Sequence, residues 1–491
     1  MSVRAQILRL SRLGADAQAW SAFRTAGLEG KRDFDTLILT GRLKKDQAVR
    51  AAGSERIRLF REASADYAAA AERTPSTYAL INAASLAQLG GDPKAARGYA
   101  EQVLALLDSG QHDPDTPYWL AATRAEAELL TGDPAAAQAT MAQAAALLPR
   151  AWEEHATTLR QFALLLDASG ADAGWLDQFR PAPVLHFDGL IGLAADDAAA
   201  SRTIAEAVTK LRPSLGIGAL AAGSDILIAE ALLATDAELH VVLPCDAECF
   251  VAQSVAPAGG DWAARFGKLL DAAASVTITS PIATLSDAAI DLAKQVAMGM
   301  AIRQARALAT RPVALRITDA RAPTTHGAAE ALWRAAGHAI EAVPLARSAE
   351  VHPLADAARD TLTALVAVRD KPVRSYASFG EALRVAKAKG AAAGIDLSLS
   401  ADDTLALAAL NGAPGAIVAT SRAAAAALLH DPNLEADLIG GVRSPTGEDE
   451  LWRLRPIAPQ AAPATRSAAP RARAGSAPAA PPPRPRVKPS L

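Results

Sequence analysis

A short apolar segment, a glycine loop and an apolar helix-forming segment follow one another between Gly216 and Glu230. A second apolar segment, Glu238 to Pro244, comes directly after them. This order predicts a strand, a loop, the start of a helix and a second strand. Such a loop places backbone N–H groups and a helix N-terminus at the end of a strand, where α/β sheets bind ligands. The segment therefore predicts a nucleotide-type pocket.

The same alternation continues on both sides of this segment. Strands are expected near residues 184–188, 214–219, 238–243, 275–279 and 312–318. Helices fit between them, at about 196–211, 224–235, 261–273 and 286–309. Strands alternating with helices favour a parallel, Rossmann-like sheet. Pro181 and Pro183 mark a boundary, and we assign residues 181–348 to this α/β domain.

The chain before this domain, residues 1–180, has a helical pattern throughout and contains a repeat. One copy runs from Tyr78 to Pro93 and the other from Tyr118 to Pro134. Each ends in Gly-Asp-Pro, which predicts a helix stop at glycine and a new helix with Asp as N-cap and Pro in its first turn. The pattern is typical of a tetratricopeptide-like all-α solenoid that binds a protein partner, although the interval exceeds the standard ~34 residues.

Two further segments follow the α/β domain. Residues 349–457 are expected to form a small α+β module. Residues 458–491 are rich in Ala, Pro and Arg and should form a disordered tail, because they offer too little apolar surface for a core. The net charge is −3, and the six basic residues of this tail leave about −9 for the rest of the chain. Such an acidic body argues against nucleic-acid binding except through the tail, for which a solvated role is the simpler interpretation.

Composition and the two cysteines exclude several other classes. Apolar residues make up 51% of the chain and aromatic residues 4%, which fits a helix-rich soluble protein with small side chains at its interfaces. No apolar run is long enough to span a membrane, and the N-terminus does not read as a secretory signal, so we expect a cytoplasmic protein. Cys245 and Cys249 have the spacing of half a metal site, but buried small residues explain them more simply and no metal is expected.

The candidate ligand-binding residues lie at the predicted carboxyl edge of the sheet: Gly189, Gly216, Gly218, Gly223, Ser224, Asp225, Glu230 and Pro244. Gly218 and Gly223 let the backbone approach a phosphate or a ribose, and Ser224 can cap the helix. Asp225 suits a ribose hydroxyl. For Asp225 and Glu230 the alternative is a carboxylate that simply complements the positive end of the helix dipole.

Part of the helical region resembles a known scaffold. Thr36 to Asp46 leads into a helix around Tyr67, and Thr77 to Ala84 follows. Together these segments resemble the helical TRAF-binding region of apoptosis signal-regulating kinases and its bacterial relatives, over roughly the first 175 residues. The resemblance implies an interaction and regulatory scaffold. Stacked helical pairs of any origin would give similar patterns.

The α/β domain resembles the SLOG superfamily of Rossmann-like nucleotide-binding proteins. The segments that carry the resemblance are His186–Gly189, Gly216–Gly218, Leu220–Asp225, Glu230, His240–Pro244 and Gly260–Phe266. Leu190 stands where relatives carry a histidine. The Pro-Gly-Gly-x-Gly-Thr stretch of the phosphoribohydrolases is missing, and the nearest equivalent, Thr324 to Gly327, keeps one glycine. The departure weakens a hydrolase interpretation and favours a loop or capping role for His326 over that of a general acid.

The C-terminal module resembles a shortened class III nucleotide cyclase domain. Leu362 to Asp370 is similar to its first strand, Phe379 to Lys387 to the following helix, and Ala408 to Thr420 and Leu451 to Leu454 to later strands. Cyclase chemistry needs two carboxylates that hold two metal ions. Asp370 matches the first and no residue matches the second, so the resemblance implies an inactive remnant. An unrelated small α/β module is the alternative.

Three interpretations of function remain. The preferred one is a non-catalytic signalling protein that senses a nucleotide or nucleotide derivative in the SLOG-like pocket and binds a protein through its helices. The second is an enzyme, either an N-glycosidic hydrolase using Asp225 or Glu230, or a divergent cyclase. The third is a structural spacer, whose glycines serve turns alone.

Overall fold

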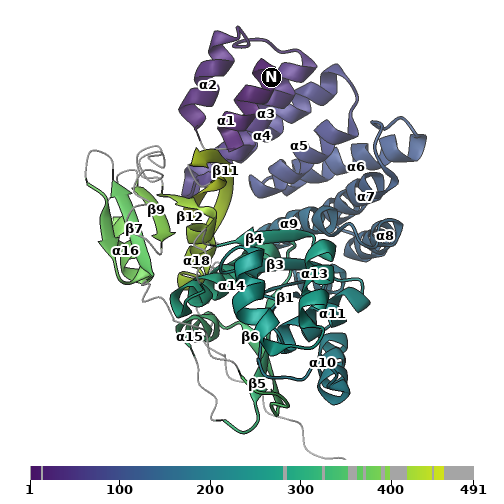
Figure 1. Ribbon diagram of the computed structural model, residues 1–491. Coiled ribbons are helices and arrows are strands. Elements are labelled where there is room, and N and C mark those ends of the chain that lie inside the picture. The colour runs from purple at the N-terminus through teal and green to yellow at the C-terminus, as the bar shows by residue number, and fades with distance from the viewer. Residues whose placement is uncertain are drawn as a thin grey trace, which may run out of the picture. The chain divides into compact units, whose positions relative to one another are not determined.

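The computed structural model describes residues 2–12, 15–279, 285–322, 327–351, 362–368, 372–388, 393–398, 417–444 and 447–457. An N-terminal helical repeat region comes first, an all-parallel α/β sheet second and a mixed sheet third (Figure 1). The predicted fold class is therefore confirmed for these parts. The tail predicted to be disordered, 458–491, lies outside the described residues.

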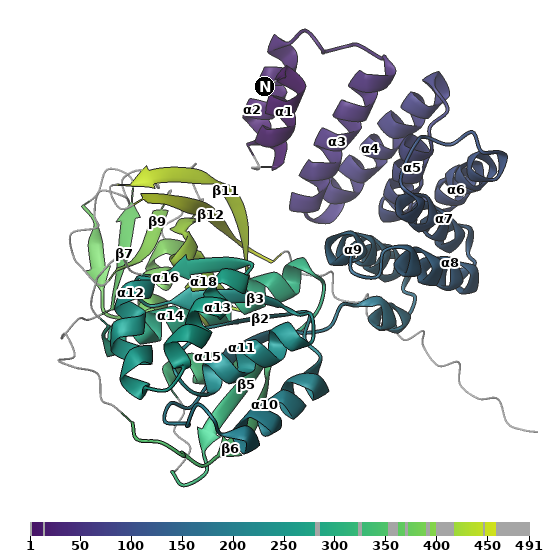
Figure 2. The same ribbon diagram turned by 45° about the vertical axis from the view of Figure 1, so that its right-hand side comes forward.

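The helices of the N-terminal region are α1 (Val3–Arg12), α2 (Asp16–Thr25), α3 (Phe34–Arg50), α4 (Gly53–Arg73), α5 (Thr77–Leu89), α6 (Pro93–Ser109), α7 (Pro117–Thr131), α8 (Pro134–Leu147) and α9 (Trp152–Ser169), followed by the 3₁₀ turn η1 (Gly174–Phe179). Most neighbouring helices pack against one another along the chain, from α3 through to α8, while α1 packs on both α2 and α3 and α9 packs on α5 (Figure 2). Small residues permit their close packing. A Cβ at Gly41 of α3 would lie 2.8 Å from the ring of Tyr67 on α4, so only glycine leaves room for that buried ring.

Both Gly-Asp-Pro elements act as predicted. Asp92 caps α6 by accepting a hydrogen bond from the backbone N–H of Ala95 at 3.0 Å, and Asp133 caps α8 through Ala136 at 2.9 Å. Proline is the first residue of each helix. Gly132 ends α7 with φ of 90°, a left-handed conformation that favours glycine.

The parallel sheet has the strand order β4-β3-β2-β1-β5-β6. Its strands are β1 (Val184–Asp188), β2 (Leu215–Gly218), β3 (Glu238–Leu243), β4 (Ser275–Ile278), β5 (Pro312–Asp319) and β6 (Ala339–Leu345). The first five match the predicted strands. Strands β2 to β4 are added on one side of β1, and β5 and β6 on its other side. In α/β sheets a ligand crevice commonly opens at such a switch in direction, called a switch point.

Helices cover both faces of this sheet. They are α10 (Ala198–Leu211), α11 (Ser224–Ala234), α13 (Trp262–Ala272), α14 (Asp287–Ala307) and α15 (Ala328–Ala335), with the short turns α12 (Ala247–Phe250), η2 (Val251–Val255) and η3 (Ala256–Ala258) after β3. Leu185 and Phe187 of β1 join the core with α10, α11 and α13. Val184 joins the other core, with α14 and α15. Because side chains alternate along a strand, His186 and Asp188 point toward the α14 face.

The mixed sheet has the order β11-β12-β10-β9-β7-β8. Its elements are β7 (Thr363–Val368), β8 (Arg374–Tyr376), α16 (Phe379–Ala388), β9 (Ala393–Ser398), β10 (Ile417–Thr420), α18 (Ser421–His430), β11 (Leu434–Ser444) and β12 (Gly447–Pro456). Helix α18 packs directly against α14, so the two sheets share one hydrophobic core. The expected strand and helix at 362–370 and 379–387 correspond to β7 and α16, whereas Asp370 lies outside the described residues.

Candidate functional site

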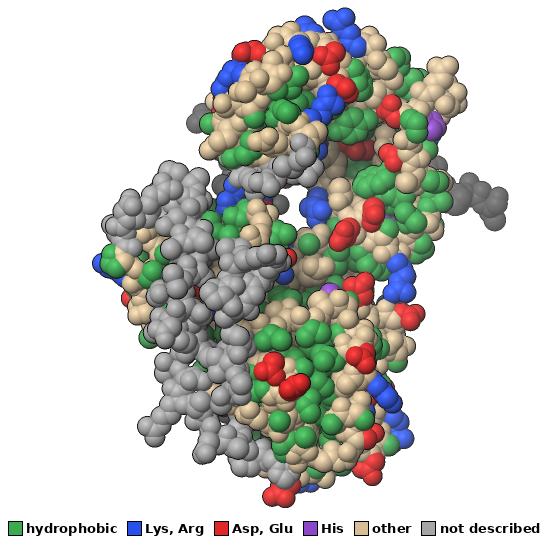
Figure 3. Space-filling view, turned by 45° about the horizontal axis from the view of Figure 1, so that its top comes forward, with side chains coloured by type: hydrophobic (Ala, Val, Ile, Leu, Met, Phe, Trp, Pro, Cys, Tyr) green, Lys and Arg blue, Asp and Glu red, His purple; other side chains and the backbone are tan. Residues whose placement is uncertain are grey.

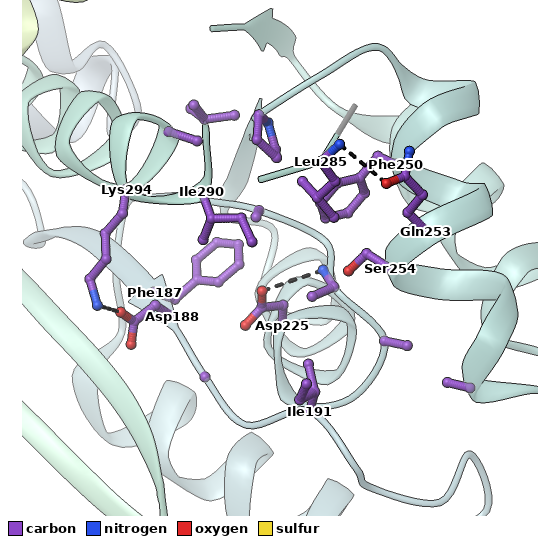
Figure 4. A pocket seen from close by; sticks show the side chains of 18 of the residues that line it. Phe187, Asp188, Ile191, Asp225, Phe250, Gln253, Ser254, Leu285, Ile290 and Lys294 are labelled. Carbon is purple, nitrogen blue, oxygen red and sulfur yellow. Dashed lines mark hydrogen bonds and ion pairs between the residues drawn. The ribbon is translucent and has the colours of Figure 1, made fainter. Parts of the chain in front are cut away.

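A cavity of about 510 Å³ opens at the carboxyl ends of β1, β2 and β3 (Figure 4). Its floor comes from residues 186–189 and from the segments that follow β2 and β3. Its walls come from α12, η2 and η3 on one side, from the first half of α14 on another, and from Glu350 and Val351 beyond β6. The carboxyl edge of the sheet thus carries, on the β1–β3 side of the switch point, a cavity of the size that holds small ligands.

Apolar side chains at the mouth of this cavity remain open to solvent. Ile191 is 38% exposed, Ile290 40% and Val351 38%, and all three line the cavity. Phe187 and Phe250 lie deeper and are buried. Large aliphatic side chains gathered around a concave site, instead of scattered singly, mark a place where apolar surface is available to a ligand.

An ionic network lies along one wall. Asp188, at the end of β1, forms an ion pair with Lys294 of α14, and its other oxygen lies 3.9 Å from Arg316 of β5. Burial is the largest single influence and opposes ionisation of Asp188, but the neighbouring positive charges, Lys294 first among them, together outweigh it, so the pKa of Asp188 lies below its ordinary value. Arg316 also pairs with the buried Glu330 of α15. These charged side chains form a continuous series from the cavity to α15, which covers the same face of the sheet as α14.

A second carboxyl group faces the cavity in a different protonation state. Asp225, in the first turn of α11, is 8% exposed and accepts a hydrogen bond from the Ala221 N–H at 3.3 Å. Burial, with the charge of Asp188 added to it, raises the pKa of Asp225 to about 8. Asp225 is therefore mostly protonated at neutral pH, and its hydroxyl can donate a hydrogen bond to a ligand.

A buried histidine completes the polar floor. His186 lies on β1 with 3% exposure, and its Nδ1 is 3.2 Å from the carbonyl oxygen of Ile217. Its Nε2 has no hydrogen-bond partner among the described residues. Burial lowers the pKa of His186 to about 4, so the ring is neutral at physiological pH.

The loop after β1 lies across the N-terminus of α11. The Ser224 N–H donates to the carbonyl oxygen of Leu190 at 3.1 Å, and the Leu190 N–H donates to Ser224 Oγ at 2.5 Å. Ile191 and Gly223 add an antiparallel bridge. The chain thus uses its own backbone to satisfy the first N–H group of this helix.

The structure brings three of the eight candidate residues to the cavity: Gly189, Asp225 and Pro244. The other glycines lie against the protein itself. A Cβ at Gly216 would meet the side chain of Leu232, one at Gly218 the backbone oxygen of Phe187 at 2.6 Å, and one at Gly223 the oxygen of Leu190 at 2.5 Å.

The last two candidates are held by other protein groups. Ser224 bonds to the loop after β1, as described above. Glu230 forms a two-armed ion pair with Arg265 of α13, at 2.7 and 2.5 Å, and does not line the cavity. Arg265 in turn stacks on the ring of Trp262, 4.3 Å from its centroid. Glu230 thus serves the packing of α11 on α13.

Several residues that line the cavity were not predicted from the sequence, above all Lys294, Gln253 and Ile290. They lie on α14 and η2, distant in sequence from the glycine loop, and only the crossover of α14 back toward β1 places them there. Gln253 bridges two walls, because its Oε1 accepts a hydrogen bond from the Leu285 N–H and its Nε2 contacts Cys249 Sγ, both at 3.2 Å.

The two cysteines and the segment around His326 are the remaining features singled out in the sequence, and none of their described residues lines the cavity. Cys245 and Cys249 are free, buried thiols with their sulfur atoms 2.6 Å apart. Within the described part of the chain, no group of three or more His, Cys, Asp or Glu side chains is arranged to hold a metal ion. Thr324 and His326 lie outside the described residues.

Replacement of Gly189 by alanine is expected to disrupt the hydrogen bonds between Leu190, in the loop after β1, and Ser224 of α11. The new Cβ would overlap Ser224 Oγ and lie 2.9 Å from Ser224 Cβ and 3.2 Å from Asp225 Oδ1. We expect a loss of about 1–3 kcal/mol in the free energy of unfolding, measured by urea titration.

A double-mutant cycle tests the cause of that loss. In a Ser224→Gly background the same alanine should cost clearly less, because the overlapping side chain is gone. Equal costs in the two backgrounds would show that the loop does not depend on this contact.

Comparison with known proteins identifies the first part of the chain. Residues 1–87 match the family model described as TPR-S, Tetratricopeptide Repeats-Sensor. No curated protein matches the chain, and no solved structure matches it. The match covers helices α1–α4 and most of α5, so this first part of the helical region is a TPR-S region, and tetratricopeptide repeats are a protein-interaction architecture.

The described Lys and Arg side chains do not gather into one patch in the view of Figure 3, where they are scattered among acidic and apolar ones. Within the described ranges no helix combines the length and the apolar character that crossing a membrane requires.

Proposed function

We propose that this chain is a non-catalytic sensor that binds a nucleotide or a nucleotide derivative in the cavity at the end of β1–β3 and a protein partner through its helical repeats. The observation that carries the proposal is the cavity itself. It combines an apolar, solvent-open mouth at Ile191, Ile290 and Val351 with a polar floor formed by the partly buried Asp188 and the buried Asp225. A SLOG-like pocket would occupy the same edge of the sheet, and the TPR-S region supports the sensor role.

The floor offers the groups that a nucleoside moiety needs. The ionised Asp188 can accept hydrogen bonds from ribose hydroxyls, and the protonated Asp225 can donate one to a ring nitrogen or a carbonyl. Ile191, Ile290 and Val351 provide exposed apolar surface for a flat base. A few polar groups in a mainly apolar cavity give orientation and specificity to a small ligand.

A thermal-shift screen tests the proposal. Full-length protein is heated with nucleosides, nucleoside mono- and triphosphates and NAD. A ligand at one hundred times its Kd should add about 2.7 kcal/mol of stability. No shift with any of these compounds would instead support a purely structural spacer.

One observation favours an enzymatic alternative. Two carboxyl groups of one cavity have pKa values displaced in opposite directions, with Asp188 lowered and Asp225 raised to about 8. Such a split is the pattern of an acid and base pair in N-glycosidic hydrolysis, where Asp225 would protonate the departing base. Release of free base from a nucleoside monophosphate, abolished by Asp225→Asn, would establish this alternative.

A further inference from the structure

The place where a glycine loop usually holds phosphate is closed in this chain. A phosphate binds a helix N-terminus through free N–H groups. At α11 the Ser224 N–H is already paired with the Leu190 oxygen, and residues 189–191 lie across the helix start. The glycines give no opening either, because Gly218 packs on Phe187 and Gly223 on Leu190.

The charge of the cavity also opposes phosphate. The carboxylates of Asp188, Asp287 and Glu350 line it, whereas Asp225 is mostly protonated and adds little charge at neutral pH. Lys294 is the one Lys or Arg side chain among its described lining residues. Lys294 is paired with Asp188, so its charge is already balanced. Asp287 and Glu350 are exposed at the rim, where a charged ligand would pass. Like charges within such a partly enclosed space repel more strongly than in bulk water.

We infer that the ligand is a nucleoside-like molecule without a polyphosphate, either uncharged or cationic, held by its base and sugar. The inference rests on the proposed function and narrows its ligand class. The apolar walls receive the base, the floor carboxyl groups bind its polar edge or the sugar hydroxyls, and the acidic rim discriminates against anions.

Calorimetric titration of the full-length protein tests the inference. The probes are adenosine, guanosine, cytidine and uridine, each compared with its own 5′-triphosphate. At least one nucleoside should bind about tenfold or more tightly than its triphosphate. A triphosphate that binds as tightly as its nucleoside, or more tightly, would overturn the inference and leave the proposed function intact. No binding of any probe would count against both.

A pair of rim variants identifies the cause of the discrimination. Asp287→Asn combined with Glu350→Gln removes two exposed carboxylates that line the cavity. The matched control, Asp271→Asn combined with Glu206→Gln, removes two exposed carboxylates that do not line it. The rim variant should reduce the ratio of nucleoside affinity to triphosphate affinity several-fold. The control variant should leave this ratio unchanged. Equal effects of the two variants would contradict a role for the rim.

Discussion

Between about pH 4 and about pH 8 the variant Asp225→Asn is expected to become progressively more stable than the wild-type protein. The ordinary pKa of an aspartate is 3.8, and burial raises that of Asp225 to about 8 in the folded state. Across this window the folded protein holds a proton that the unfolded chain releases. Wild-type stability should therefore fall as pH rises, by up to ~1.4 kcal/mol for each pH unit.

A variant that merely lost a contact would be less stable than the wild type at every pH, whereas the stability difference expected here changes with pH. The contribution of Asp225 to stability is fully present below its unfolded pKa and is lost as pH rises through the folded pKa. Asparagine keeps the shape of a protonated aspartate and does not titrate, so the variant lacks this slope. Asp188, whose pKa is lowered, is present in both proteins.

Urea titrations at several pH values measure the difference between the two proteins. Asp271→Asn, at an exposed site on α13, is the matched control and should follow the wild type at every pH. Parallel pH profiles for Asp225→Asn and the wild type would mean that Asp225 is ionised in the folded protein. The hydrogen-bond donor proposed for the cavity would then be absent.

The same glycine-to-alanine change is expected to have opposite effects on two helices. Gly299 lies where α14 meets α18, and a Cβ there would overlap the carbonyl of Ala425 and lie 2.9 Å from its Cα. Backbone atoms cannot rotate away as a side chain can. We expect Gly299→Ala to cost about 1–3 kcal/mol or more in the free energy of unfolding.

Gly267 of α13 provides the comparison. A Cβ at this position would have no neighbour within 4 Å, so Gly267→Ala should stabilise the protein by roughly 0.5–1 kcal/mol through helix propensity alone. Chemical unfolding of both variants checks the pair. A neutral result for Gly299→Ala would mean that α14 and α18 are not packed this closely.

Much of the fold could be predicted because local signals agreed with tertiary structure. The apolar segments from Val184 to Asp319 are short, bounded by turn residues and separated by helical patterns, so five parallel strands follow from periodicity. The sixth strand, β6, gave little signal. It lies at the sheet edge, is half exposed and contains Glu341 and Pro344, which weaken a strand pattern.

The site could be predicted only in part. The glycine loop located the correct edge of the sheet, and Gly189, Asp225 and Pro244 line the cavity. The glycine pattern itself was ambiguous, because an absent side chain can make room for a ligand or for the protein's own Leu232 and Phe187. Lys294 depends on a helix crossing that no local pattern specifies.

Blocking the cavity tests the central claim most directly. Ala258 is exposed and lines the cavity, whereas Ala252, exposed on the preceding turn, does not. Calorimetric titration of the tightest nucleoside or nucleotide should show binding to the wild type and to Ala252→Trp, and at least about tenfold weaker binding to Ala258→Trp, whose indole would fill the mouth. Equal affinity for the two tryptophan variants would place the ligand elsewhere and contradict the account.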